Sequence, residues 1–428
     1  MWVTRENISR GKATGMAGDI APLTGHVSWE ILIKNCEDRV SNEIRVHLVP
    51  ICRALQAAIK SNEKLSSEWI ERTLMRLEAC VDRTWETLNT GHWKDVEVRH
   101  RYCYTICSAL KCIVLEMSSK NLDDSSKIAV TTKMIEQVDK GLLLGAPLEE
   151  IPDLLTKIAS RLNEEICPDT CKDPGILQCD SKNIVKNLLP GMGWVERLKT
   201  PSMETFYRDI FVKKIPAVLE GCIDHWRALT RWKNPNYLLK MGGTRTVPIE
   251  IGSKYTEEDW SQHLITLSEF IKSHVTKNND KLGYLAQHQL FEQIPELKED
   301  FSIPDYCSFS DNTEDSFPDI NAWFGPKGTV SPLHYDPKNN LLCQVFGCKR
   351  VILYHPNDSN NLYPYDTRLL CNTAQVDPIN PDYDNFPDFK YARGMMCYLN
   401  EGEMLFIPPG WWHHVVSLTP CFSISFWW

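Results

Sequence analysis

Apolar residues in the first part of the chain recur at steps of three and four residues. The pattern spans residues 27–163 and is broken by a polar stretch at residues 121–126. This spacing places apolar side chains on one face of an α-helix, so amphipathic helices are predicted. The clearest series are Trp69, Ile70, Leu74, Leu77, Val81, Trp85 and Leu88, and then Tyr102, Ile106, Leu110, Ile113 and Met117. No signature recurs with a period of about 34 or about 40 residues, which favours a helical bundle over a solenoid.

Residues 166–190 lose this helical period. Residues that break regular structure are frequent in the segment, namely Pro168, Pro174, Gly175 and Pro190. Several Asp and Lys residues accompany them, as expected for a solvated connection between domains. We therefore interpret residues 1–165 as an all-helical N-terminal domain and residues 166–190 as a linker.

The remainder of the chain, residues 191–428, carries a different pattern. Short apolar runs lie at residues 341–346, 349–354, 404–407, 415–418 and 421–427. Turn residues separate these runs and no helical pattern lies between them, which favours an antiparallel barrel or sandwich. The fold class expected for the whole chain is therefore α+β.

Composition narrows the class of protein. Of the 428 residues, 43% are hydrophobic and 24% are charged, as in soluble globular proteins. No run approaches the roughly 20 apolar residues of a membrane-spanning helix, and the N-terminal sequence lacks the apolar core of a secretory signal. We therefore expect a protein inside the cell, with no membrane partner. The formal net charge of -9 disfavours direct nucleic-acid binding and favours a basic peptide or protein partner.

The chain has 16 cysteines, none of them in a Cys-x-x-Cys pair. Without an export signal, most are expected to be reduced thiols that serve as small core residues. The closest grouping is Cys167, Cys171 and Cys179. A structural zinc ion usually has four protein ligands, and no fourth ligand stands at a suitable spacing, so a zinc site is disfavoured here.

Two motifs in the β-rich region predict a metal site. In GTVSPLHYD (residues 328–336), His334 and Asp336 are two residues apart, so on a strand they point the same way and can bind one cation. In GEMLFIPPGWWHHV (residues 402–415), a Pro-Gly turn precedes His413 on a later strand. Two histidines and one carboxylate leave three coordination positions open, which is typical of non-haem iron(II) oxygenases. The neighbouring His414 should face the opposite way and is interpreted as a packing or surface residue.

At these residues the sequence resembles the JmjC family of the cupin superfold. The resemblance covers residues 198–428 and is strongest in VPIEIGSKYTEEDWSQ, YLAQHQLFEQIPELKEDFSIPDYC, NAWFGPKGTVSPLHYDPKNNLLCQVFG and the terminal FSISFWW. Within the family it is similar to a lineage whose older name is that of a lysine demethylase and which also carries a helical N-terminal domain. The resemblance implies a double-stranded β-helix that binds Fe(II), with 2-oxoglutarate and O2 as cosubstrates for the oxidation of a nearby C–H bond.

The resemblance also implies residues that bind the cosubstrate. A buried carboxylate needs a cation and hydrogen-bond donors, and Lys349 stands where several peptide-hydroxylating members of the family carry a lysine. Tyr284, Ser331 and Asn340 are expected to hydrogen-bond 2-oxoglutarate, and Trp427 to form a wall of its pocket. The alternatives are an ordinary surface lysine and a terminal aromatic residue that only closes the core.

For the substrate, the resemblance points to Glu250, Trp260, Gln287 and Trp323. A carboxylate beside aromatic faces suits an arginine side chain, which can pair and stack at the same time. The same tryptophans could form an aromatic cage for a methylated lysine. In the plainer interpretation Glu250 is a solvated acid at a strand end and Trp260 is a core residue.

Three functional hypotheses follow. The first is a hydroxylase of arginine side chains in protein or peptide substrates, and the second is a histone H3 methyl-lysine demethylase of the same mechanism. The third is a non-catalytic chromatin or protein interaction factor, which the presence of all three metal ligands and the lysine disfavours. The resemblance implies residence in the nucleus, with the cytoplasm as the alternative, although no cluster of about five to eight basic residues marks an import signal.

Overall fold

The structure is a computed structural model, and it describes residues 22–91, 95–120, 122–166, 177, 184–252, 254–257, 259–277, 281–310 and 317–428. The cysteines of the disfavoured zinc site, Cys167, Cys171 and Cys179, lie outside the described residues. So does most of the expected linker.

The N-terminal region is helical. It comprises η1 (Leu23–His26), α1 (Trp29–Asp38), α2 (Asn42–Ser61), α3 (Ser67–Leu88), α4 (Val98–Ser119), α5 (Asp124–Leu144) and α6 (Leu154–Glu165). The polar stretch before α5 supplies its N-cap, because Asp123 accepts a hydrogen bond from the Ser126 backbone N–H at 3.0 Å. Helix α4 lies at the centre of the bundle and is buried along most of its length. No helix in the described ranges is long and apolar enough to cross a membrane.

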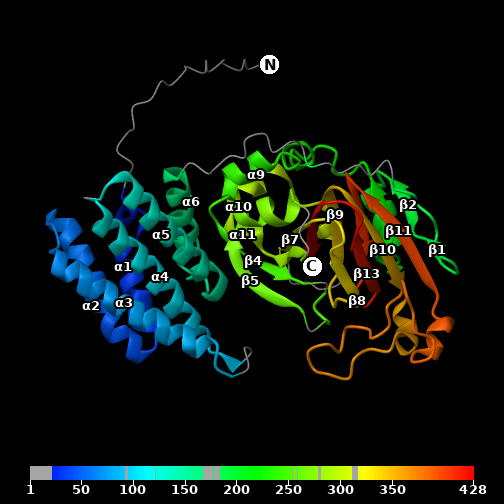
Figure 1. Ribbon diagram of the computed structural model, residues 1–428, viewed down its shortest axis with the longest axis horizontal. Coiled ribbons are helices and arrows are strands. Elements are labelled where there is room, and N and C mark those ends of the chain that lie inside the picture. The colour runs from blue at the N-terminus through cyan, green and yellow to red at the C-terminus, as the bar shows by residue number, and fades with distance from the viewer. Residues whose placement is uncertain are drawn as a thin grey trace, which may run out of the picture.

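Two β-sheets form the C-terminal region. The first has the order β1 (Gly193–Trp194), β11 (Gly394–Asn400), β10 (Cys348–Tyr354), β13 (Trp412–Ser417) and β8 (Val330–His334). The second has the order β2 (Glu196–Lys199), β3 (Ala217–Glu220), β12 (Glu403–Ile407), β9 (Asn340–Phe346), β14 (Cys421–Trp427), β7 (Asp319–Gly325), β6 (Gly283–His288), β4 (Thr246–Ile251) and β5 (Ser261–Thr266). The sheets face each other as a double-stranded β-helix, which confirms the expected fold class (Figure 1).

Short helical segments connect these strands. Before β7 they are α7 (Met203–Thr205), η4 (Phe206–Phe211), α8 (Ala228–Arg231), α9 (Pro235–Gly242), α10 (Leu267–Phe270), η5 (Ile271–Val275), α11 (Leu290–Gln293), η6 (Pro295–Asp300) and η7 (Asp305–Ser308). Between β10 and β11 lie η8 (Pro356–Leu362) and η9 (Pro387–Tyr391). Many of the earlier segments pack on the outer face of the larger sheet and form one hydrophobic core with it. Residues between β10 and β11 cover the outer face of the smaller sheet in the same way.

The interior between the sheets follows the two-residue period of the strands. Alternate residues of β10, β9, β12 and β13 point inward. Many of these inward residues are apolar and form a third core, which includes Val351, Leu353, Leu405 and Val415. The same strands carry Lys349, Asn340 and His413 among these apolar residues, since His413 lies opposite Leu353 and Asn340 lies opposite Ile407. The polar side chains therefore lie within a largely apolar interior.

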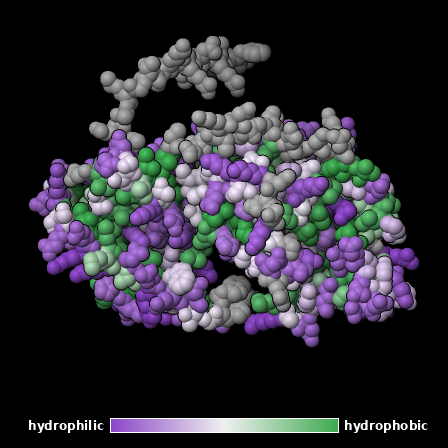
Figure 2. Space-filling model, in the orientation of Figure 1, coloured by the Kyte–Doolittle hydropathy of each residue, from purple (hydrophilic) through white to green (hydrophobic). Residues whose placement is uncertain are grey.

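The helical region lies against the edge of the larger sheet formed by β4 and β5 (Figure 1). Helix α6 contributes Asn163, whose side chain bonds the Met241 carbonyl at 3.2 Å and the Thr244 hydroxyl at 2.7 Å. Helix α5 contributes a buried ion pair between Asp139 and Arg245. Hydrophilic residues cover much of the visible face of both regions, with hydrophobic ones in small groups between them (Figure 2).

Candidate metal centre and cosubstrate pocket

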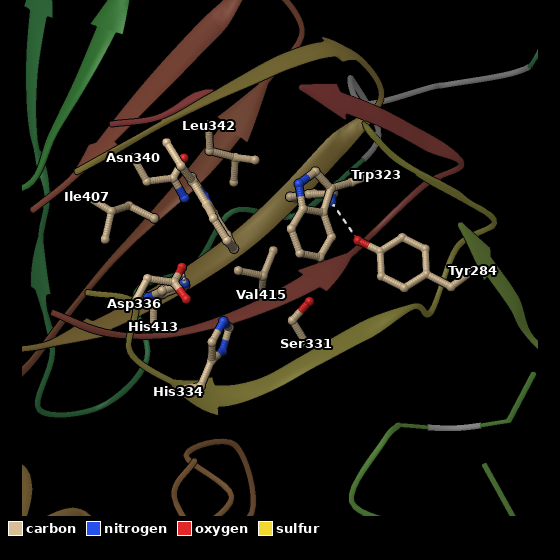
Figure 3. A pocket seen from close by; sticks show the side chains of 12 residues that line it. Tyr284, Trp323, Ser331, His334, Asp336, Asn340, Leu342, Ile407, His413 and Val415 are labelled. Atoms are coloured by element: carbon tan, nitrogen blue, oxygen red, sulfur yellow. Dashed lines mark hydrogen bonds and ion pairs between the residues drawn. The ribbon is translucent and has the colours of Figure 1, made fainter. Parts of the chain in front are cut away.

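The three predicted metal ligands come together on two neighbouring strands. His334 ends β8 and His413 lies directly opposite it on antiparallel β13, so their ring centroids are 4.2 Å apart. Asp336 follows two residues after His334, and its Oδ2 lies 3.6 Å from His413 Nε2. One candidate ligand atom from each residue lies within 4.8 Å of the others. All three side chains point toward one another in Figure 3.

The turn between β12 and β13 explains the Pro-Gly pair of the second motif. The Gly410 N–H donates to the Asp336 carbonyl at 2.8 Å, and Gly410 has a φ of 78°. Glycine adopts this left-handed conformation without the cost that a side chain would bring. The turn therefore holds the backbone of Asp336 beside the strand that carries His413.

Backbone carbonyls orient both imidazole rings. His334 Nδ1 lies 2.7 Å from the Pro332 carbonyl, and His413 Nδ1 lies 3.0 Å from the Trp411 carbonyl. A carbonyl oxygen only accepts, so each Nδ1 carries the proton and each Nε2 offers its lone pair to the centre, as metal-binding histidines require. Burial, reinforced by His334, lowers the pKa of His413 to about 4, which keeps this ring neutral at physiological pH.

The centre fits a divalent cation. Asp336 Oδ2 is buried, and no described residue forms a hydrogen bond with it. An isolated buried carboxylate oxygen is costly, whereas a cation between it and two imidazole nitrogens removes that cost. Two histidines and one carboxylate with open positions are the donor set of non-haem iron(II) sites. His414 faces away, as predicted, and lines a separate cavity with Asp377 and Lys254.

Beside the metal ligands lies a cavity that contains all five residues predicted for the cosubstrate. It is lined by Tyr284, Ser331, Asn340, Lys349 and Trp427, together with Trp323, Leu342, Ile407, Val415 and the three ligands. The apolar members Leu342, Ile407 and Val415 were missed in the sequence. A signal for them existed, because each occupies an inward position on a strand recognised from its apolar pattern.

Lys349 is the main electrostatic feature of this cavity. It is only 2% exposed, its Nζ donates to the Tyr284 hydroxyl at 3.2 Å, and no described acidic side chain forms an ion pair with it. Burial lowers its pKa to about 8, since the loss of hydration disfavours the charged form. Asn340 Oδ1 and Trp427 Nε1 are also buried without a hydrogen-bond partner in the described chain. A carboxylate of a small ligand would match the Lys349 ammonium and the Trp427 N–H, both of which are donors.

A second, larger pocket adjoins the first and shares Tyr284, Trp323, Ser331, His334, Asp336 and Trp427 with it. Its outer walls include Glu250 from β4 and Gln287 from the end of β6. Trp323 lies between the two pockets and is held by a 2.9 Å hydrogen bond from its Nε1 to the Ser425 hydroxyl. The outer pocket therefore reaches the metal ligands His334 and Asp336.

Trp260 contacts Glu250, which lines the outer pocket, but Trp260 is not itself among the residues that line it. Burial raises the pKa of Glu250, and a hydrogen bond from Trp260 partly opposes that shift. Trp260 is 36% exposed, so the interpretation as a core residue is wrong. Glu250 has no ion pair with any described cation, and the idea that it is simply a solvated acid does not fit its burial.

Two further residues of the outer pocket were not found in the sequence. Tyr255 and Thr373 line it, and their hydroxyl groups are 3.3 Å apart. Tyr255 lies in the sequence between Glu250 and Trp260, both predicted substrate residues, and this position was a weak indication that it belongs to the same pocket. Thr373 lies in an irregular segment, and its approach to His334 through a β-bridge depends on tertiary structure alone.

The fold and this site together define a cupin-type oxygenase with a facial metal triad. Residues 203–428 match the family described as a cupin-like domain. The chain is 41% identical to Jumonji C domain-containing protein 5 of Drosophila melanogaster, over 84% of this chain and 87% of that protein. It is 42% identical to lysine-specific demethylase 8 of Danio rerio (82% and 87% covered) and 36% identical to lysine-specific demethylase JMJ30 of Arabidopsis thaliana (82% and 85%).

The chain therefore belongs to the JmjC family of oxygenases, whose members generally depend on Fe(II) and 2-oxoglutarate. The similarity to these relatives extends beyond the cupin-like domain into the helical region. The predicted family membership and enzyme class are confirmed. The roles of individual cosubstrate and substrate residues stay predictions.

Proposed function

We propose that the protein uses Fe(II) and 2-oxoglutarate to hydroxylate a C–H bond in the side chain of an arginine residue of a protein substrate. One observation supports this choice of substrate: the Glu250 carboxylate, which forms no ion pair with a cation among the described residues, lines the pocket that reaches the metal ligands. A guanidinium group would pair with this carboxylate and stack on the tryptophan faces around it.

Each part of the pocket has a task in this reaction. His334, Asp336 and His413 would hold the iron, which together with 2-oxoglutarate and O2 supplies the oxidising chemistry. Lys349 and Tyr284 would bind the distal carboxylate of 2-oxoglutarate at the closed end of the inner cavity. Asn340 and Trp427 would take further hydrogen bonds, while the apolar side chains Leu342, Ile407 and Val415 exclude water.

Substrate placement would depend on the outer pocket. Glu250 holds the far end of the arginine side chain, so its aliphatic carbons pass Trp323 on the way to the metal ligands. Trp323 cannot swing away without losing its hydrogen bond to Ser425. This arrangement orients one C–H bond toward the centre, which is the main contribution that a protein makes to such a reaction.

The second candidate is removal of a methyl group from lysine. Two of the relatives named above carry the name lysine-specific demethylase. The aromatic rings of Trp323 and Tyr255 in the outer pocket, with Trp260 beside Glu250, would suit a methylated ammonium group. Arginine and methylated lysine would interact differently with Glu250. A guanidinium uses the carboxylate for directed hydrogen bonds, whereas a trimethylammonium group has no N–H to donate.

The test is to incubate the purified protein with Fe(II), 2-oxoglutarate and air, with matched arginine-containing and methyl-lysine-containing peptides. His334→Ala serves as the control for metal-dependent oxidation, and peptide masses are measured. We expect an arginine peptide that is one oxygen heavier and that is absent with His334→Ala. A methyl-lysine peptide that is one methylene lighter would contradict the proposal and support the demethylase.

A second variant tests whether the Glu250 carboxylate binds the substrate. Glu250→Gln keeps the shape of the side chain and removes its charge. Hydrogen bonds to charged groups contribute about 1.5–3 kcal/mol, so kcat/KM for the arginine peptide should fall by roughly 10- to 150-fold. Succinate formation without peptide should remain as in the wild type. An unchanged kcat/KM would remove the basis for an arginine substrate.

A further inference from the structure

Asp139 is a fully buried carboxylate at the contact between the helical region and the catalytic region. Its side chain is 0% exposed, and that of Arg245 is 1% exposed. Asp139 Oδ1 accepts hydrogen bonds from Arg245 Nε at 2.9 Å and Nη2 at 2.6 Å, and its Oδ2 accepts one from the Thr246 N–H at 2.6 Å. Helix α5 is thereby attached to the first residue of β4.

Gln293 extends this contact into the catalytic region. Its Nε2 donates to Asp139 Oδ1 at 2.8 Å and to the Thr246 carbonyl at 2.7 Å. Because the amide nitrogen serves these two acceptors, its oxygen Oε1 faces His288, whose Nε2 lies 2.7 Å away. Gln293 and His288 are both buried. An unbroken chain of buried hydrogen bonds therefore runs from α5 to the last residue of β6.

The two strands reached by this chain carry residues of the outer pocket. The register of β6 against β7 shifts between Leu285 and His288, and Gln287 within this bulge has a φ of 46°. The bulge brings both Ala286 and Gln287 to the pocket. A bulge next to an active site commonly redirects a side chain in this way, and a left-handed residue other than glycine must be held by its surroundings.

Strand β4 supplies the other half of the connection. It begins at Thr246, which is bonded to Asp139 through its N–H and to Gln293 through its carbonyl. It continues to Glu250, which pairs with Tyr284 of β6. The polar contacts of Asp139 thus end on both strands that position the substrate residues.

Stability alone is a weak explanation for such a network. A buried ion pair loses much of its electrostatic gain to the cost of desolvation, and apolar residues would join the two regions at least as well. Directed hydrogen bonds, in contrast, fix the orientation of each group that they reach.

We propose that Asp139 is a positioning residue of the substrate pocket. Through Gln293 and His288 it holds the bulge that presents Gln287, and through Thr246 it holds the strand that presents Glu250. The helical region is then a part of the catalytic unit. This inference rests on the proposed function where it names the substrate side of the site.

The test compares variants in the full-length protein. Asp139→Asn keeps the shape of the side chain but replaces the carboxylate with an amide, whose NH2 group would face hydrogen-bond donors. Gln293→Met removes the hydrogen bond to His288 and leaves the ion pair between Asp139 and Arg245 in place. Asn163→Ala is the matched control, because Asn163 bonds across the same contact without reaching β6. The measurements are KM and kcat for the arginine peptide, KM for 2-oxoglutarate, and succinate formation without peptide.

We expect Asp139→Asn and Gln293→Met to raise the peptide KM by about five- to tenfold, the effect of one to two hydrogen bonds. The KM for 2-oxoglutarate and the peptide-independent turnover should stay within about twofold of the wild type. The control should leave all these values unchanged. If Asp139→Asn does not fold, Gln293→Met decides the outcome. Folded variants with the wild-type peptide KM, or with equal losses for peptide and 2-oxoglutarate, would overturn the inference.

Hydrogen exchange separates this inference from the proposed function. If the wild type does not oxidise arginine peptides, the proposed function fails, but exchange in the same variants still decides the network. We expect faster amide exchange in residues 246–251 and 283–288 and unchanged exchange in residues 348–354. Unchanged exchange in all three segments would refute the positioning role.

Discussion

The cosubstrate cavity and the substrate pocket share a wall, but they are constructed from different kinds of structure. The cavity around Lys349 lies between two sheets, and its residues occupy inward positions of regular strands. The substrate pocket uses the end of β4, the bulge in β6 and irregular segments around Tyr255 and Thr373. Regular strands thus form the cosubstrate cavity, which serves the chemistry common to the family. Irregular segments form much of the substrate pocket, which selects the substrate.

The difference extends to how each pocket is supported. The inner cavity is supported by the barrel itself, through pairings among β8, β13 and β10. The outer pocket also depends on contacts from the helical region through Asp139. Changes at the two pockets should therefore affect 2-oxoglutarate and peptide separately, and the following predictions test that separation.

The largest effect is expected from loss of a metal ligand. His413→Ala should reduce both peptide oxidation and succinate formation to the level of the chelated wild type, because both pockets serve the same centre. His414→Ala is a close control, since it removes a neighbouring imidazole that faces away from the centre. Metal content and succinate formation measure the result. Full succinate formation by His413→Ala would show that the site is wrongly assigned.

Loss of Lys349 should affect only the inner cavity. Lys349→Met removes a buried charge that has no counter-ion in the described structure, so the ligand-free protein should be as stable as the wild type or more stable. Binding of 2-oxoglutarate should weaken at least about 30-fold, as expected when a buried charge pair loses one partner. Thermal unfolding without ligand and titration with 2-oxoglutarate measure the two effects. A comparable rise in peptide KM measured with saturating 2-oxoglutarate would break the proposed separation.

The two pockets should respond to pH in opposite directions. The pKa of Lys349 is lowered to about 8 in the ligand-free protein, so its ammonium form predominates below that pH and is lost as pH rises through it. Affinity for 2-oxoglutarate should then fall by up to about tenfold per pH unit. Burial raises the pKa of Glu250, so its carboxylate is lost at a higher pH than that of an exposed glutamate as the solution is acidified.

Separate titrations of the two KM values against pH measure these effects. We expect the KM for 2-oxoglutarate to rise on the alkaline side and the KM for an arginine peptide to rise on the acidic side. Lys349→Met should remove the alkaline rise, and Glu250→Gln the acidic one. A single variant that removed both would show that the two pockets titrate together.

The smallest effects should come from a pair of conservative aromatic changes. Trp427→Phe removes an indole N–H that is buried at the inner cavity, and Tyr255→Phe removes a hydroxyl that contacts Thr373 at the outer pocket. A single hydrogen bond contributes about 0.5–1.5 kcal/mol, so each KM should rise by roughly two- to twelvefold. Trp427→Phe should raise the KM for 2-oxoglutarate, and Tyr255→Phe the KM for peptide. The opposite assignment would contradict the division between the pockets.

The sequence determined the helical region, the β-rich region and the metal triad. Helical periodicity is local, because side chains three and four residues apart share a face whatever lies around them. The two-residue spacing of His334 and Asp336 is local in the same sense, and the Pro-Gly turn before His413 is a property of a few residues. The inward positions of Asn340, Lys349 and His413 follow from strand alternation once the strands are known.

Tertiary structure decided what lies around these residues. His334 and His413 are opposite each other only because β8 and β13 pair in one register. Lys349 lines the same cavity as Asp336, and the barrel keeps it from forming an ion pair with any described acidic residue. Tyr255, Thr373 and Asp139 belong to the site or its support through contacts between distant segments. Sequence periodicity does not predict such contacts, because they depend on how the helices, strands and loops pack against one another.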